Sequence, residues 1–144
     1  MLHGISPLLS PELLKTIAEM GHGDELVIGD GNFPAASMAQ RLIRADGHGV
    51  APLLEALLPL FPLDRFVEQP VGLMQVVAGD TTVPTIWDEY KAIVQRYQPE
   101  RIAAGFDMVE RFDFYDRSRR AYAILATGES ALYANVILKK GVVE

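Results

Sequence analysis

One segment near the start of the chain, residues 20–32 (MGHGDELVIGDGN), gathers side chains that suit acid–base chemistry. His22, Asp24 and Asp30 stand among glycines, with an apolar run between them. An imidazole changes its charge near neutral pH, so His22 is able to deliver or remove a proton. Carboxylates accept hydrogen bonds, as the binding of a polar ligand requires. The segment therefore predicts a polar site, provided that its two ends can approach each other.

The same residues also have ordinary structural explanations. A histidine after a helix-ending glycine commonly donates to the last carbonyls of that helix. Asp24, in a glycine-rich turn, can accept bonds from its own backbone. His22, Asp24 and His48 are conceivable metal ligands, but their spacing matches no known ligand pattern, so we expect no metal. The glycine pairs at 21/23 and 29/31 match neither nucleotide-binding motif, so they do not indicate a phosphate-binding loop.

The elements around this segment determine whether its ends can meet. Residues 25–29 form a short apolar run between turn residues, which predicts a buried strand. Residues 11–20 follow a serine suited to capping and end before a glycine, which predicts a helix. His22 then precedes the strand and Asp30 follows it, so a straight chain could separate them by up to about 25 Å.

The rest of the chain continues the alternation of helices and strands. Apolar periodicity predicts further helices over 35–43, 53–61, 87–97 and 112–120, and strands over 71–78, 121–126 and 132–138. Such an alternation is typical of an α/β fold whose central sheet is covered by helices on both faces. We find no repeat, low-complexity tract or linker, so we expect a three-layer single domain over residues 1–144. Loops at the carboxyl ends of strands commonly form the sites of such sheets, which favours the loop that contains Asp30.

Composition disfavours several classes of function. The 144 residues carry a net charge of −6, which argues against nucleic acid or an anionic membrane as partner. No cysteine is present, so no thiol nucleophile or zinc–thiolate site can form. No apolar run approaches the roughly 20 residues that a membrane span requires. The first residues lack the basic region and apolar core of a signal peptide, so we expect a cytoplasmic protein.

Several motifs, in one order along the chain, resemble those of the family of L-fucose mutarotases and D-ribose pyranases. They are residues 20–25 (MGHGDE), 29–35 (GDGNFPA), 43–47 (IRADG), 57–61 (LLPLF), 111–115 (RFDFY), 127–129 (TGE) and 133–142 (YANVILKKGV). Together they span nearly the whole chain and are far more specific than any single motif. The resemblance implies a ribose pyranase-like α/β fold and an isomerase that interconverts the anomers or ring forms of a free sugar without a cofactor.

The resemblance also assigns roles to individual residues. His22 falls on the family's catalytic general acid or base. The implied substrate-binding residues are Asp30, Arg111, Tyr133, Ala134 and Asn135. Mutarotation needs a proton delivered to the ring oxygen and another removed from the anomeric hydroxyl, then the reverse. A histidine and directional hydrogen bonds therefore suffice, without metal, nucleotide or nucleophile.

Two positions bear on which sugar is used. Ala134 stands where fucose-type members often have glycine and ribose-type members have alanine. Gly31 and Asn32 stand where some relatives carry alanine and histidine, which removes an extra imidazole. The remaining motifs are fucose-type, so L-fucose is the expected monosaccharide. A D-ribose pyranase is the nearer alternative, and a sugar-binding module without catalysis is the more distant one.

The apolar character of the chain predicts assembly. Mean hydropathy is +0.14, and the predicted helix over 53–61 is apolar on much of its circumference. Large exposed apolar patches usually mark interfaces. Similar proteins form closed rings, commonly decamers of two stacked pentamers, so the resemblance implies a homo-oligomer, likewise a decamer. Tyr133 and Asn135 are then expected near a subunit boundary, where they could complete a neighbour's site. A dimer that hides residues 53–61 is the alternative.

Overall fold

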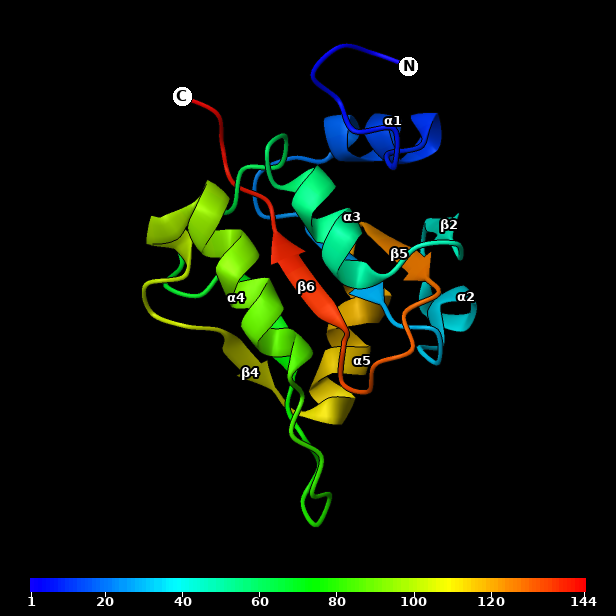
Figure 1. Ribbon diagram of the computed structural model, residues 1–144, viewed down its shortest axis with the longest axis vertical. Coiled ribbons are helices and arrows are strands. Elements are labelled where there is room, and N and C mark those ends of the chain that lie inside the picture. Colours follow the sequence, from blue (N-terminus) through cyan, green and yellow to red (C-terminus); the bar gives the residue numbers. More distant parts are fainter.

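A mixed six-stranded sheet runs through the computed structural model, which describes residues 1–144 (Figure 1). Its strands are β1 (Glu25–Gly29), β2 (Leu42–Ala45), β3 (Val71–Met74), β4 (Asp107–Val109), β5 (Ala123–Thr127) and β6 (Val136–Lys139). They lie in the order β2-β5-β1-β6-β3-β4. β6 runs antiparallel to both of its neighbours, β1 and β3, whereas the other pairs are parallel.

Helices cover both faces of this sheet. They are α1 (Pro11–Glu19), α2 (Ala35–Met38), α3 (Val50–Leu57), α4 (Ile86–Tyr97), α5 (Arg111–Arg120) and the short 3-10 helix η1 (Pro99–Arg101). In Figure 1, α3 and α4 lie in front of the sheet and α5 lies behind it. Side chains in β1 alternate accordingly: Leu26 and Ile28 join the core under α1, α3 and α4, whereas Val27 joins the core under α2 and α5. The predicted three-layer α/β architecture is confirmed.

The segment that begins at Ser10 folds as its sequence predicts. The Ser10 hydroxyl accepts the N–H of Leu13 at 3.1 Å and so caps α1, whose first residue is Pro11. β1 has the predicted bounds, 25–29, and is buried along nearly its whole length. None of the helices is long and apolar enough to cross a membrane.

The predicted helix over 35–43 is wrong. α2 ends at Met38, and residues 42–45 form β2, which pairs in parallel with β5. Ile43 is buried because it lies opposite Leu125 in this pairing, so the sheet decides its conformation. β4 was not predicted at all. It has three residues at the edge of the sheet, which is too short for an apolar pattern to develop.

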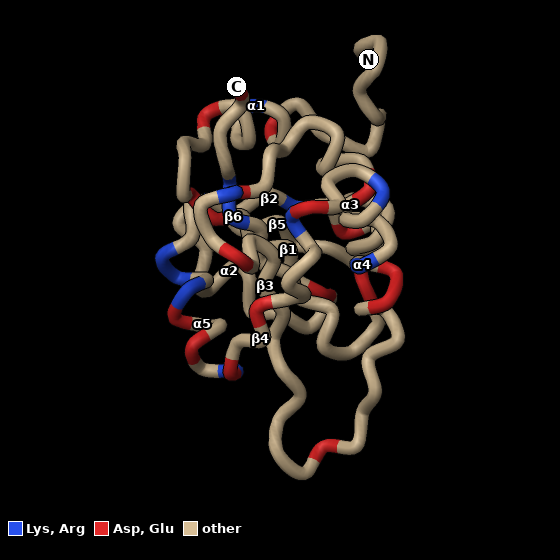
Figure 2. Tube along the Cα trace, turned by 90° about the vertical axis from the view of Figure 1, so that its left-hand side faces the viewer, with Lys and Arg blue, Asp and Glu red and all other residues tan.

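The antiparallel pair β1 and β6 determines where the predicted site residues lie. Glu25 lies opposite Lys139, and Ile28 lies opposite Val136. The segment before β1 therefore lies beside the end of β6, and the segment after β1 lies beside the start of β6. Near the latter end, the loop between β3 and α4 projects away from the body of the molecule (Figures 1 and 2).

Candidate active site

A shallow pocket of about 230 Å3, lined by both polar and apolar side chains, lies at the carboxyl end of β1. Its lining includes Asp30, Tyr133 and Asn135, together with Tyr115 from α5 and Asp80 from the loop after β3. The backbone N–H of Asp30 donates to Asn135 Oδ1 at 2.8 Å, which joins the segment after β1 to the segment before β6. The pocket therefore brings together three of the predicted substrate-binding residues, two of them through this contact.

Asp30 is the buried carboxyl group of this pocket, with 8% of the residue exposed. Burial raises the pKa of Asp30 above its usual value, against the opposing effect of backbone N–H groups at Asn32, Ala134 and Phe33. The Asn32 N–H donates to Asp30 Oδ1 at 3.0 Å. Asp30 is therefore a fixed acceptor that also takes up a proton more readily than an exposed aspartate does.

Tyr133 and Ala134 are held by α4. Tyr133 has a φ of 55°, a left-handed conformation that residues other than glycine rarely adopt. Its carbonyl accepts the indole N–H of Trp87 at 2.7 Å, and the next carbonyl, of Ala134, accepts the Tyr90 hydroxyl at 2.8 Å. Such a conformation persists where the surroundings fix it, and here two side chains of one helix do so.

Arg111 approaches the pocket through a second tyrosine. It is the first residue of α5, and its Nε donates to the Tyr115 hydroxyl at 3.2 Å. Tyr115 lines the pocket, whereas Arg111 does not. The bond to the Tyr115 hydroxyl raises the pKa of Arg111, so its positive charge is secure. Arg111 is thus exposed beside a residue of the pocket lining, and its guanidinium lies 5.5 Å from the ring centroids of Phe112 and Tyr115.

His22 lies at the other end of β1. The loop that contains it is bound to the chain after β6, because Gly23 N–H donates to the Lys140 carbonyl at 2.8 Å and Lys140 N–H donates to the Asp24 carbonyl at 2.8 Å. Asp30 lies beyond the opposite end of the strand. One chain therefore assembles Asp30, Tyr133, Ala134 and Asn135, with Arg111 nearby, but leaves the predicted catalytic histidine apart from them.

Asp64 is a partner of His22 that the sequence analysis missed. His22 Nε2 is 3.1 Å from Asp64 Oδ1, and the imidazole side chain is 46% exposed whereas that of Asp64 is 4% exposed. The His22 ring also contacts Phe66, with ring centroids 5.3 Å apart. No local pattern marks Asp64, because its partner is 42 residues away in sequence.

The contact with Asp64 indicates which ring nitrogen of His22 carries a proton. Burial alone would raise the pKa of Asp64, but the N–H of Phe66 and the His22 ring outweigh it and lower that pKa. An ionised carboxylate only accepts hydrogen bonds, so Nε2 carries a proton. Nδ1 of the half-exposed ring is then available to exchange a proton with a ligand.

The metal hypothesis finds no support in this geometry. No group of three or more histidine, aspartate or glutamate side chains is arranged to hold a metal ion. Asp24 instead accepts the N–H of Gly21 at 2.7 Å, which is the turn-forming role that its position allows.

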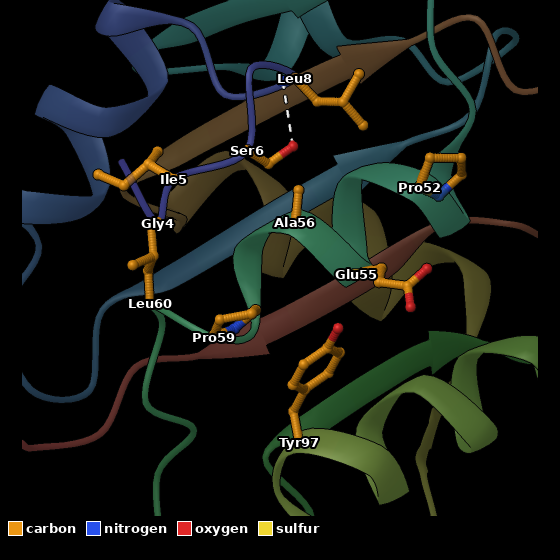
Figure 3. Close-up of a pocket in the computed structure, with 10 residues that line it drawn as sticks. All are labelled: Gly4, Ile5, Ser6, Leu8, Pro52, Glu55, Ala56, Pro59, Leu60 and Tyr97. Atoms are coloured by element: carbon orange, nitrogen blue, oxygen red, sulfur yellow. Dashed lines mark hydrogen bonds between the residues drawn. The ribbon is translucent and has the colours of Figure 1, made fainter. Parts of the chain in front are cut away.

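A larger cavity, of about 410 Å3, lies between the N-terminal segment and α3 (Figure 3). Ile5, Leu8 and Leu60 contribute apolar side chains, and Tyr97 of α4 closes one side. Its one charged residue, Glu55, pairs with Arg96. This cavity contains none of the predicted site residues, and its polar side chains are those of Ser6, Glu55 and Tyr97.

The sheet order defines a small α/β protein. The pocket at the end of β1, with Asp30, Tyr133 and Asn135 in its lining, is its candidate ligand site. A model of the RbsD / FucU transport protein family matches residues 3–143, and the chain belongs to this family. The resemblance noted in the sequence is thereby confirmed.

Curated and solved relatives agree with this assignment. An L-fucose mutarotase from Actinobacillus pleuropneumoniae is 52% identical over 142 residues, which is 99% of this chain and 97% of that protein. The crystal structure of a fucose mutarotase from Streptococcus pneumoniae in complex with L-fucose is 48% identical, with a TM-score of 0.92 over 99% of this chain and 100% of that one. Bacillus subtilis RbsD, complexed with D-ribose, has a TM-score of 0.71 over 100% of this chain and 99% of that one, and at 22% identity shares the fold.

Proposed function

We propose that this protein is an L-fucose mutarotase, an isomerase that interconverts the α and β anomers of the free sugar without a cofactor. The observation that carries the proposal is the polar pocket formed by Asp30, Tyr133 and Asn135, in a chain about half identical to proteins named L-fucose mutarotase. These side chains supply several directional hydrogen bonds, as a polyhydroxylated ligand requires.

The chemistry assigns a distinct role to each group. His22 exchanges protons with the ring oxygen or the anomeric hydroxyl, and Asp64 holds the imidazole through Nε2. Asp30, Tyr133 and Asn135 hold the sugar, and Arg111 contributes hydrogen bonds from the rim. Once the ring opens, the aldehyde rotates and the proton steps run in reverse. No bond to carbon is formed by the protein.

We further propose that a second copy of the chain completes the site. His22 and the pocket lie at opposite ends of β1, so a sugar in the pocket needs an imidazole from elsewhere. Both ends carry exposed apolar side chains, with Phe66 64% exposed beside His22, and Phe112 65% and Leu132 56% exposed around the pocket. Contact between two unlike patches is head-to-tail, and it forms a ring where the rotation between neighbouring copies closes. The decamer implied by the resemblance, the single mutarotase domain over 1–144 and the cytoplasmic location stay proposals.

Saturation-transfer NMR tests the activity. Equilibrated L-fucose and D-ribose are measured with and without the protein, and faster α/β exchange of L-fucose is expected, with a weaker effect or none on D-ribose. Faster exchange of D-ribose alone would favour a pyranase, whose fold this chain shares. Binding of sugar without faster exchange of any aldose would leave a sugar-binding module.

A further inference from the structure

The loop between β3 and α4 touches the pocket through one carboxylate. The Tyr133 hydroxyl donates to Asp80 Oδ2 at 2.6 Å, and Asp80 is among the residues that line the pocket. Val77 N–H donates to the same hydroxyl oxygen at 3.4 Å, which uses part of the acceptor capacity of the phenol. The rest of this loop projects away from the molecule (Figures 1 and 2). Asp80 is thus the side chain, and Val77 the backbone group, through which the loop meets a predicted substrate-binding residue.

The Asp80 carboxylate is held in place although the residue is exposed. Its second oxygen, Oδ1, accepts the Thr82 N–H at 2.9 Å and the Thr82 hydroxyl at 2.6 Å. These bonds and the one from Tyr133 lower the pKa of Asp80, so it is an ionised acceptor near neutral pH. Three donors on two oxygens leave the carboxylate little freedom to turn toward another partner.

The single proton of the Tyr133 phenol decides what this tyrosine can offer to a ligand. A phenol donates one hydrogen bond and accepts others, so a proton committed to Asp80 leaves only acceptor capacity toward the pocket. Tyr133 is also fixed at its backbone, where Trp87 Nε1 donates to its carbonyl. The residue is therefore constrained at both ends.

We propose that Asp80 is a positioning residue for the reaction, which holds the Tyr133 hydroxyl so that it accepts a hydrogen bond from a hydroxyl group of the sugar. The inference rests on the proposed function of the pocket. The loop between β3 and α4 then helps to orient the substrate. Tyr133 favours a ligand hydroxyl group that can donate a hydrogen bond to it.

A double-mutant comparison tests this role. Asp80→Ala is expected to slow L-fucose exchange about 10- to 100-fold, because loss of orientation at a reacting centre has effects of this size. Asp80→Asn is expected to lose less, since its amide oxygen still accepts the phenol proton. In a Tyr133→Phe background, Asp80→Ala is expected to change neither exchange nor L-fucose affinity by calorimetry. Val83→Ala, at an 80% exposed position of the same loop, is the matched control.

Two outcomes of this comparison would overturn the inference. If Asp80→Ala exchanges L-fucose at the wild-type rate, the hydrogen bond between Asp80 and Tyr133 has no part in the reaction. Equal losses from Asp80→Ala with and without the Tyr133 hydroxyl would mean that Asp80 acts on the sugar itself. If wild-type protein accelerates no sugar at all, the proposed function fails together with the inference, and this result differs from the other two.

A readout that is independent of activity is available at Tyr133. The Asp80 carboxylate raises the pKa of Tyr133, whereas Arg111, the other charged group that acts on this phenol, lowers it. Asp80→Asn is therefore expected to lower the pKa of Tyr133 in a 13C NMR titration of labelled tyrosines. Tyr133→Phe identifies the resonance among those of the 5 tyrosines. An unchanged pKa would mean that the bond does not form in solution, and would overturn the inference.

Discussion

His22 and Asp64 form a pair in which one partner is rigid and the other is accessible. The Asp64 side chain is 4% exposed and that of His22 is 46% exposed, with 3.1 Å between Oδ1 and Nε2. A carboxylate buried in this way keeps its direction, so the imidazole is oriented without being enclosed. The other ring nitrogen, Nδ1, then remains accessible to a ligand. A general acid or base needs such an arrangement.

Removal of the imidazole should therefore abolish catalysis while sparing the fold. His22→Ala is expected to lower L-fucose exchange by about 10²–10⁴-fold, the usual effect of a positioned acid–base group. Saturation-transfer NMR measures the rate, and thermal unfolding checks the fold. His48→Ala, which removes an exposed imidazole outside the pocket, is the control. Wild-type exchange in His22→Ala would show that His22 is not the acid–base group.

Asp30 allows a prediction about stability and pH. Its pKa is raised by burial, so the folded protein binds this proton more tightly than the unfolded chain does. Ionisation of Asp30 therefore lowers the free energy of unfolding as pH rises from the ordinary carboxyl range through the raised pKa. Asp30→Asn removes this cost and keeps an oxygen that can accept the Asn32 N–H. The variant is expected to be at least as stable as wild type near neutral pH, with weaker sugar binding.

Urea unfolding of both proteins across this pH range measures the effect. The difference in favour of Asp30→Asn is expected to shrink as the pH falls toward the ordinary range of a carboxyl group. Asp46→Asn is the comparison for which the opposite change in unfolding free energy is expected. The bond from Arg44 lowers the pKa of Asp46, so ionisation of Asp46 favours the folded state. A loss of stability in Asp30→Asn that grows with pH would contradict the prediction.

At the scale of elements, the sequence predicts those whose signals are local. β1 is an apolar run between turn residues, and α1 has its own cap, so both were predicted almost to the residue. The first half of β2 falls within the helix predicted over 35–43, because a four-residue segment is too short to show a distinctive period and its conformation depends on pairing with β5. A parallel partner about 80 residues away in the chain leaves no trace in the local sequence.

The same distinction applies to the site. Asp30 follows a predicted strand, whereas Asn135 and Tyr133 lie within the strand predicted over 132–138, of which only the part from Val136 onward is strand. The resemblance named all three. Asp64 and Asp80 lie in loops without regular structure and were missed, since each acts through a residue that is distant in sequence. Tertiary contacts alone reveal such supporting residues.

The role of α4 in holding the segment 133–135 is testable. Tyr90 is fully buried, and its hydroxyl donates to the Ala134 carbonyl at 2.8 Å. Tyr90→Phe leaves this buried carbonyl without its partner, which is expected to cost about 1–3 kcal/mol of unfolding free energy. Because the segment carries Tyr133 and Asn135, affinity for L-fucose should fall as well. Urea unfolding and calorimetry measure the two effects.

Tyr97→Phe is the matched control on the same helix. Tyr97 is 37% exposed and lies away from the pocket, so loss of its hydroxyl should change neither quantity. Equal stability of Tyr90→Phe and wild type would show that the bond to Ala134 does not fix the segment.

At the scale of the whole molecule, the two halves of the proposed chemistry lie at opposite ends of the sheet. The pairing of β1 with β6 enforces this separation, since both strands would have to unpair for His22 to reach the pocket of its own chain. A closed assembly removes the difficulty, because the histidine end of one protomer can face the pocket end of the next. The exposed Phe66, Phe112 and Leu132 side chains are then covered.

Light scattering on the purified protein tests the assembly. We expect a mass that is a large multiple of 15.9 kDa, and a mass near that of one chain would contradict the proposal. A dimer would agree with the alternative in which residues 53–61 are hidden. Most of the apolar side chains of α3 are already buried within one chain, which favours the larger ring over that dimer.

Subunit mixing tests whether the site is shared. His22→Ala and Tyr133→Phe chains are each expected to have strongly reduced exchange, but a shared site can draw Tyr133 from the first variant and His22 from the second. Random mixing in equal amounts should then restore about a quarter of the sites, because each of the two intact residues is present with a probability of one half. Exchange of L-fucose reports the recovery, and wild-type protein taken through the same mixing is the reference. Subunit exchange is verified with a mass tag on one variant. If tagged hybrids form and show no recovery of exchange, the site is not shared between subunits, and the proposal that a second copy completes it is wrong.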